Sequence, residues 1–321
     1  MLNRVMGLVC CLALLVPVGC DKSKPTTSAK KVIGVIPKGL THIHWRSVKA
    51  GAEKAAKEEG VEVKWDGPPK ESDLNTQIRI IGDMRNRGVD ALVIAPLSKT
   101  ALSEYLADAK KKMPVIVFDS GSDFKDYDAY VATDNFKGGQ LCGQAMLKLI
   151  GDEKGIELAM IKYGAESEST LLREAGFLSE IKKNPNIVLY DNQYAGDDVA
   201  KGHDLMSRML VAHPGINAVF SSNESTTVGA MNALEEVKKL GKIKFVGFDR
   251  SPELVAALDK GQIQALVIQD PIKMGYLSVK AAAAALRGEK PTREQPIPAT
   301  LVTPENKNDP AIAELLRPQV E

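Results

Sequence analysis

The stretches that decide the fold are Val219-Phe-Ser-Ser-Asn223-Glu-Ser, Phe245-Val-Gly-Phe-Asp249 and Ala265-Leu-Val-Ile-Gln269-Asp-Pro. Each is an apolar run of strand length that ends on a hydrogen-bonding side chain, and helical patterns separate the runs. Side chains that follow parallel strands meet at one edge of the sheet, where α/β folds bind their ligands. Asn223, Asp249 and Gln269 are poor nucleophiles but good partners for hydroxyl groups, so they predict a cleft that recognises hydroxyls.

The same alternation of short apolar runs and helical patterns covers the chain from Lys31 onward. Strands are predicted at residues 32–36, 61–65, 91–95, 115–119, 129–132, 156–161, 187–190, 218–221, 244–248 and 265–268. A helix is predicted from Trp45 to Glu59, where apolar residues recur at helical spacing and Gly60 follows as a stop signal. Such alternation indicates an α/β fold with parallel sheets covered on both faces.

These strands are too many for one compact unit, so the chain is predicted to form two similar doubly wound parallel-sheet lobes. No Pro/Gly-rich linker separates the halves near Asp134, and the lobes are therefore expected to be joined by a hinge of several short crossings. A ligand would bind in the crevice between the strand ends of the two lobes.

Composition and motifs exclude several classes of protein. The chain has 321 residues and a net charge of +1 without a basic stripe, which argues against nucleic-acid binding. It contains no Gly-x-Ser-x-Gly elbow, no phosphate-binding Gly-x-x-x-x-Gly-Lys-Ser/Thr loop and no His-Glu-x-x-His run. We therefore expect a protein that is not an enzyme and that needs no cofactor.

The first twenty residues predict a lipoprotein signal peptide. Arg4 precedes an apolar stretch from Val5 to Val18 that ends at Gly19-Cys20, so Cys20 is the expected lipidation site. Residues 21–30 are polar and include Pro and Ser, as in a flexible tether. The alternatives are ordinary cleavage, or retention as a membrane anchor, although the stretch is shorter than the ~20 residues that span a bilayer. The expected location is the periplasm or the outer face of the cytoplasmic membrane.

Cysteine usage agrees with an exported protein. Cys10 and Cys11 leave with the signal peptide and Cys20 takes the lipid, so Cys142 alone remains and no internal disulfide is possible. Cys142 lies in a helical apolar pattern and is predicted to be a core residue rather than a reactive thiol.

Several further motifs occur in a characteristic order between Lys31 and about Val302. They are Lys31-Val-Ile-Gly-Val-Ile-Pro, Trp45 with Gly51-Ala52, Val115-Ile-Val-Phe-Asp119, Ala132-Thr-Asp134-Asn135 with Gly138-Gly139, Arg173-Glu-Ala-Gly176-Phe177, and Gln269 with Gly275. With the three stretches quoted first, this set resembles a type I periplasmic sugar-binding protein of the ribose-binding kind. The resemblance implies an N-terminal lobe of residues 31–133 plus 271–298 and a C-terminal lobe of residues 134–270 plus 299–321.

The resemblance also implies a ligand site. An aromatic pair that sandwiches the sugar falls on His44 and Trp45, preceded by the polar His42, and a strand-end carboxylate for two hydroxyls falls on Asp119. Ser120 stands where ribose binders have an arginine, while Arg173 matches the second of two arginines and Leu171 stands at the first. The implied ligand-binding residues are His42, His44, Trp45, Asp119, Ser120, Arg173, Asn223, Asp249 and Gln269.

Each of these residues also has a plain structural alternative. Trp45 could be a core aromatic, Asp119 and Asp249 turn residues after strands, Asn223 a local turn and Gln269 a helix cap. His42 and His44 could bind zinc, but His203 and His213 are too far along the chain to complete a site, so no metal is expected.

The expected function is that of a monomeric, lipid-anchored receptor that captures a monosaccharide or similar polyol and delivers it to an ABC import permease. The alternative is a sensor that presents bound solute to a membrane receptor or kinase without transport. Lys38, Asp197 and Arg250 also lie near the predicted site, and an acidic or phosphorylated sugar is expected if Lys38 and Arg250 both point inward.

Overall fold

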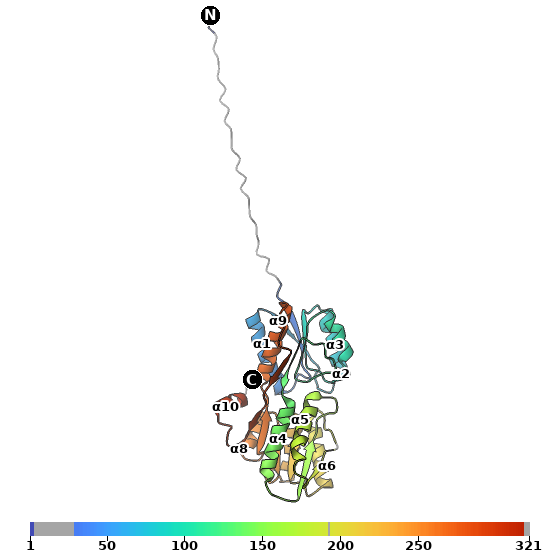
Figure 1. Cartoon of the computed structure of the whole chain (residues 1–321), viewed down its shortest axis with the longest axis vertical. Coiled ribbons are helices and arrows are strands. Elements are labelled where there is room, and N and C mark those ends of the chain that lie inside the picture. The colour runs from blue at the N-terminus through green and yellow to red at the C-terminus, as the bar shows by residue number, and fades with distance from the viewer. Residues whose placement is uncertain (3–28, 192, 318–321) are drawn as a thin grey trace.

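The chain forms two α/β lobes that lie one above the other along the long axis of the molecule (Figure 1). The computed structural model describes residues 1–2, 29–191 and 193–317. The predicted signal peptide at residues 1–20, including Cys20, and the tether at 21–30 fall almost entirely outside the described residues.

The first lobe is built on a parallel sheet with the strand order β11-β5-β4-β3-β1-β2. Its strands are β1 (Val32–Ile36), β2 (Glu62–Trp65), β3 (Ala91–Ile94), β4 (Val115–Phe118), β5 (Ala129–Thr133) and β11 (Glu294–Ile297). Helices α1 (Ile43–Glu59) and α9 (Pro271–Leu286) pack on one face, and α2 (Leu74–Asn86) and α3 (Ser103–Lys110) pack on the other.

The second lobe repeats this plan with the strand order β12-β10-β9-β8-β6-β7. Its strands are β6 (Ile156–Ile161), β7 (Ile187–Tyr190), β8 (Ala218–Ser221), β9 (Lys244–Phe248), β10 (Ala265–Ile268) and β12 (Thr300–Val302), of which β12 runs antiparallel to β10. Helices α4 (Asn135–Ile150) and α5 (Glu168–Ile181) cover one face. Helices α6 (Val199–Ala212), α7 (Glu224–Glu236), α8 (Pro252–Asp259) and α10 (Pro310–Leu316) lie on the other.

The central strands are continuous apolar runs because both of their faces are covered by helices. Val-Ile-Val-Phe in β4 and Ala-Leu-Val-Ile in β10 are buried throughout. Each sheet therefore separates two apolar clusters, one under each helical layer. This packing fixes the strand ends, and with them the residues that follow the strands.

The chain passes between the two sheets at three places. β5 of the first sheet leads into α4, β10 of the second leads into α9, and β11 leads into β12. Two of these passages begin helices whose caps are aspartates, since the Asp134 and Asp270 carboxylates accept from the backbone N–H groups of Lys137 and Lys273. Three short connections side by side are the geometry of a hinge.

Glycines permit the closest helix contacts in both lobes. A Cβ atom at Gly51 in α1 would lie 2.0 Å from the carbonyl oxygen of Ile272 in α9, and one at Gly139 in α4 would lie 2.0 Å from that of Arg173 in α5. Since real side chains never approach so closely, only glycine allows these helices to pack at this distance. The start of α1 and the side chain of Arg173 are positioned by these contacts.

The predicted fold class is confirmed, and the observed strands agree with the predicted ones to within one residue at each end. Helix α1 begins at Ile43, two residues before the predicted start, and ends before Gly60, which has a left-handed φ of 68°. Strands β11 and β12 were not predicted. Within the described part of the chain, no helix has both the length and the apolar character needed to cross a membrane.

Candidate functional site

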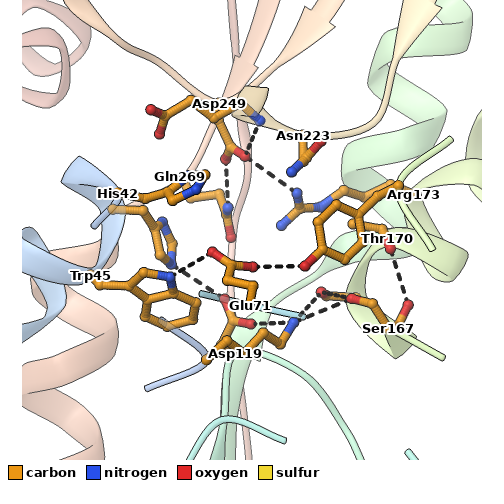
Figure 2. Close-up of a pocket in the computed structure, with 15 residues that line it drawn as sticks. His42, Trp45, Glu71, Asp119, Ser167, Thr170, Arg173, Asn223, Asp249 and Gln269 are labelled. Atoms are coloured by element: carbon orange, nitrogen blue, oxygen red, sulfur yellow. Dashed lines mark hydrogen bonds and ion pairs between the residues drawn. The ribbon is translucent and has the colours of Figure 1, made fainter. Parts of the chain in front are cut away.

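A polar cavity lies between the lobes where the strand ends of both sheets meet (Figure 2). Its volume in this closed arrangement is about 40 Å³, room for about three water molecules. It is lined by Lys38, His42, His44, Trp45, Glu71, Asp119, Tyr163, Ser167, Ser169, Thr170, Arg173, Asn223, Glu224, Asp249 and Gln269. The cavity therefore gathers every site residue predicted from the sequence except Ser120.

Asp119 follows β4 and faces two nitrogen groups of its own lobe. Its carboxylate lies 3.0 Å from the Lys38 ammonium and 3.3 Å from Nε2 of His44. Burial alone would raise the pKa of Asp119, but the charge of Lys38 and the contact with His44 outweigh it and hold the pKa well below the usual range. Asp119 is thus an anion in the cavity, and Lys38 neutralises most of its charge.

Asp249 follows β9 and enters the cavity from the other lobe (Figure 2). It lies 3.5 Å from the Arg173 guanidinium, and it accepts hydrogen bonds from Nε2 of Gln269 at 2.6 Å and from the backbone N–H of Glu224 at 3.1 Å. Gln269 in turn accepts a hydrogen bond from Thr133 at the end of β5. This chain of contacts connects the two lobes at the hinge side of the cavity.

Arg173 is buried within the second lobe, and several groups of that lobe hold its side chain. Its guanidinium donates to Oδ1 of Asn135 at 2.8 Å and to the backbone carbonyl of Ser222 at 3.1 Å. Its plane lies over the Phe248 ring, 3.9 Å from the centroid. With its side chain held on several sides, Arg173 fixes the position of Asp249 and presents only part of its charge to the cavity.

Asn223 and Glu224 form the start of α7. The Asn223 side chain accepts from the backbone N–H of Thr226 and donates to Ser225 at 3.0 Å, so it caps the helix. Glu224 lines the cavity, and burial together with the charge of Asp249 raises the pKa of Glu224 to about 8. At neutral pH its carboxyl group is protonated and can both donate to and accept from a hydroxyl group.

The predicted aromatic pair is placed in the first turn of α1. The Trp45 ring is 3% exposed and contacts the rings of His44 and Phe118 edge to face. Its indole Nε1 donates to Glu71 at 2.7 Å. Trp45 thus belongs to the apolar core of the first lobe and reaches the cavity with one edge, while His42 lines the cavity without a capping bond.

Ser120 occupies a different place from the other predicted residues. It is fully buried, and its hydroxyl oxygen accepts from the backbone N–H of Ser169 at 3.0 Å. Ser120 therefore joins the two lobes beside the cavity and does not line it.

Several lining residues were not among the predicted ligand contacts. Tyr163 comes just after β6, where a strand-end signal could have found it, whereas Ser167, Ser169 and Thr170 lie farther on at the start of α5. Glu71 lies in a loop with no periodic pattern, so the sequence offered no signal for it. The ammonium of Lys38 points inward but is paired with Asp119, and Arg250 lines a neighbouring cavity with Glu224.

The lobes are in direct contact across the cavity. Lys38 of the first lobe donates to Ser167 and Ser169 of the second, at 3.3 and 3.2 Å. The Tyr163 hydroxyl donates to Glu71 at 2.9 Å, also across the cleft. The described residues thus form a closed two-lobed arrangement. Among them, no three His, Cys, Asp or Glu side chains converge as metal ligands.

Comparison with known proteins shows which family the chain belongs to. Residues 33–290 match the family model described as periplasmic binding protein domain. The chain belongs to the periplasmic binding protein family. The resemblance inferred from the sequence motifs is therefore confirmed.

Individual relatives cover nearly the whole chain. It is 30% identical to the ribose import binding protein of Salmonella typhimurium over 94% of this chain and 98% of that protein. It is 30% identical to the D-allose-binding periplasmic protein of Escherichia coli over 80% of this chain and 85% of that protein. A solved structure of a carbohydrate transporter solute-binding protein from Agrobacterium radiobacter, in complex with D-arabinose, matches with a TM-score of 0.87 and 35% identity over 90% of this chain and 99% of that one.

Proposed function

We propose that this protein captures a monosaccharide or similar polyol in the cavity between its lobes and delivers it to an ABC import permease. The observation that carries the proposal is the pair of carboxylates, Asp119 and Asp249, that reach one cavity from the strand ends of opposite lobes. Carboxylates accept strong hydrogen bonds from hydroxyl groups, and contacts from both lobes to one ligand favour the closed state. The names of the relatives, which refer to ribose, allose and arabinose, support the same ligand class.

The charges in the cavity favour a ligand without acidic groups. Four carboxyl groups line it, those of Glu71, Asp119, Glu224 and Asp249, against two permanent cations, Lys38 and Arg173. Each cation already faces a carboxylate. Among the described residues that line this cavity, neither Lys38 nor Arg173 is left without a carboxylate partner, so a neutral sugar is favoured over the acidic or phosphorylated one expected if Lys38 and Arg250 both pointed inward.

The closed cavity is smaller than a sugar ring, so binding requires the lobes to open and to close again around the ligand. The direct contacts of Lys38 with Ser167 and Ser169 would then be exchanged for contacts with sugar hydroxyls. A thermal-shift screen of the chain from residue 21 onward, against neutral sugars, sugar acids and polyols, tests the proposal. At least one neutral sugar should raise the melting temperature, whereas no response to any sugar or polyol would contradict it.

We further propose that the mature protein is a monomer in the periplasm, anchored to the membrane by a lipid on Cys20. The apolar stretch that ends at Gly19-Cys20 motivates this proposal. Cys20→Ser should move the protein from the membrane fraction to the soluble fraction without changing sugar affinity. A wild-type protein that is soluble and unacylated in its own host would contradict the anchor.

A further inference from the structure

The carboxylates that line the cavity between the lobes differ in their partners. The Asp119 carboxylate lies 3.0 Å from the Lys38 ammonium, and the Asp249 carboxylate lies 3.5 Å from the Arg173 guanidinium. Glu71 lines the same cavity and, within the described part of the chain, forms no ion pair with a lysine, arginine or histidine. Two of these three carboxylates are therefore paired with cations, whereas the third is not.

Glu71 is held by two neutral donors, one from each lobe. One of its carboxylate oxygens accepts from the indole Nε1 of Trp45 at 2.7 Å, and the other accepts from the Tyr163 hydroxyl at 2.9 Å. A carboxylate has about four lone-pair positions, so acceptor positions remain on both oxygens. The two donors thus hold Glu71 in the site without supplying a positive charge (Figure 2).

The other ionisable groups near the cavity do not balance the charge of Glu71. His44 contacts Asp119 at 3.3 Å, and Arg250 lines a neighbouring cavity beside Glu224 rather than beside Glu71. Burial and the neighbouring carboxylates raise the pKa of Glu224 to about 8, so Glu224 adds no negative charge at neutral pH. One carboxylate charge therefore remains in the closed site, where an unpaired charge is costly unless a ligand supplies its partner.

The entrance to this cavity is also acidic. An open depression at the mouth of the cleft is lined by Glu71, Glu166 and Asp197, and none of the described residues in its wall is a lysine or arginine. Carboxylates gathered around an entrance attract a cationic ligand and repel an anionic one. Glu71 belongs to the walls of both the depression and the cavity, so a cationic group drawn to the open cleft meets Glu71 at their border.

We propose that Glu71 selects a monosaccharide that carries a protonated amino group, whose ammonium binds the Glu71 carboxylate while Asp119 and Asp249 bind the hydroxyl groups. An ammonium has three N–H donors and a positive charge, so it can use the free lone pairs of Glu71 and cancel its charge. The preferred ligand is then an amino sugar rather than its neutral parent. This inference rests on the proposed function, because the amino sugar must occupy the same cavity.

Pairs of sugars that differ at a single position test this selection. Titration calorimetry of the chain from residue 21 onward compares D-glucosamine, D-galactosamine, D-mannosamine and 6-amino-6-deoxy-D-glucose with D-glucose, D-galactose and D-mannose. An amino group in place of a hydroxyl changes the charge of the sugar and hardly changes its size, and at about pH 6 such a group is protonated. At least one amino sugar should bind tenfold or more tightly than its parent sugar.

A pair of variants tests whether Glu71 is the selecting group. Glu71→Gln removes the charge and keeps the shape, so the ratio of the affinity for the amino sugar to that for its parent should fall to twofold or less. Because both ligands are measured on the same variant, a general loss of binding cancels in this ratio. Glu166→Gln removes a carboxylate of the depression that does not line the cavity, and this matched control should keep the wild-type ratio within threefold. An unchanged ratio in Glu71→Gln would overturn the inference.

The remaining outcomes separate this inference from the proposed function. If neutral sugars bind and every amino sugar binds no more tightly than its parent, selection by Glu71 is wrong and the proposed function stands. If neither neutral nor amino sugars bind, the proposed function fails and the inference fails with it.

Discussion

The two strand-end aspartates occupy equivalent positions in the two lobes. Asp119 follows β4 and Asp249 follows β9, and each of these strands has the same place in its sheet. Both residues have a left-handed backbone, with φ of 62° and 70°, which is rare for residues other than glycine. Such strain persists only where the surroundings hold it in place, and it turns each carboxylate toward the cavity between the lobes.

The partners of these aspartates differ. Asp119 pairs with Lys38, whose ammonium also donates to Ser167 and Ser169 of the opposite lobe. Asp249 pairs with Arg173, which is held by other groups of the same lobe. One fold repeated twice thus yields an aspartate whose cation reaches across the cleft and another whose cation is held within its own lobe.

The largest expected effect concerns the buried pair of the first lobe. Asp119→Asn leaves the Lys38 ammonium, 4% exposed, without its counter-charge, and should lower the free energy of unfolding by about 3 kcal/mol. Asp249→Asn should cost less, about 1 to 2 kcal/mol, because Asp249 is more exposed and Arg173 keeps its other acceptors. Urea denaturation of the ligand-free chains measures both values.

The double variant Lys38→Met/Asp119→Asn is the control for this prediction. It removes both charges and should regain most of the stability lost in Asp119→Asn. Equal losses for the two single variants, or no recovery in the double variant, would contradict the difference between the lobes.

A second prediction concerns the helix contact that positions Arg173. Gly139→Ala introduces a Cβ atom 2.0 Å from the Arg173 carbonyl oxygen, so it should destabilise the chain by about 1 to 3 kcal/mol. Gly82→Ala in α2 is the matched control, because nothing lies within 4 Å of its new Cβ atom, and it should stabilise by about 0.5 to 1 kcal/mol. Thermal melting shows whether each substitution raises or lowers stability. A Gly139→Ala chain as stable as wild type would show that helices α4 and α5 can move apart without loss of stability.

A third prediction concerns closure. The Lys38→Met/Asp119→Asn variant loses the bonds from Lys38 to the second lobe, so the ligand-free protein should shift toward an open state with a larger radius of gyration. Arg173→Met should leave the radius of gyration unchanged, because the bonds of Arg173 lie within one lobe. Small-angle scattering measures the radius of gyration of both variants. If their profiles are indistinguishable, the bonds of Lys38 do not stabilise the closed state.

The sequence predicts the positions of the two aspartates at strand ends, but it does not predict their partners. Apolar runs such as Val115–Phe118 predict their strands because they are buried on both faces, and residues that follow strands must meet at the sheet edge. Strand β11 was missed because it is a short edge strand that contains Pro296.

The partners of the site residues could not be predicted in the same way. Lys38 and Ser167 are 129 positions apart and meet only when the lobes close. Glu71 comes from a loop without a pattern, and Trp45 looks from the sequence like a stacking platform although its ring is packed in the core. Local patterns give the positions of strand ends, whereas contacts between lobes depend on the whole fold.

A fourth prediction is a pH dependence in the second lobe. The pKa of Glu224 is raised to about 8 by burial and by the charge of Asp249, so the folded chain binds more protons than the unfolded chain between about pH 4.5 and that value. This contribution to stability is fully present below the unfolded pKa and is lost as the pH rises through the folded pKa.

Wild type should therefore lose stability relative to Glu224→Gln as the pH rises from 5 to 8. Contributions of other groups, including Glu174, whose pKa burial raises to about 7, are common to both chains and cancel in the difference. Melting temperatures at several pH values give the comparison. A difference that does not vary with pH would show that Glu224 titrates normally.

The most direct test is the affinity of each aspartate variant for the sugar that binds wild type most tightly. If the ligand is held between the lobes, Asp119→Asn and Asp249→Asn should each weaken binding by tenfold or more, about 1.4 kcal/mol or above. Titration calorimetry at a temperature where both variants remain folded measures this directly. Loss of affinity in both variants is the predicted result, and wild-type affinity in either one would contradict a site shared by the two lobes.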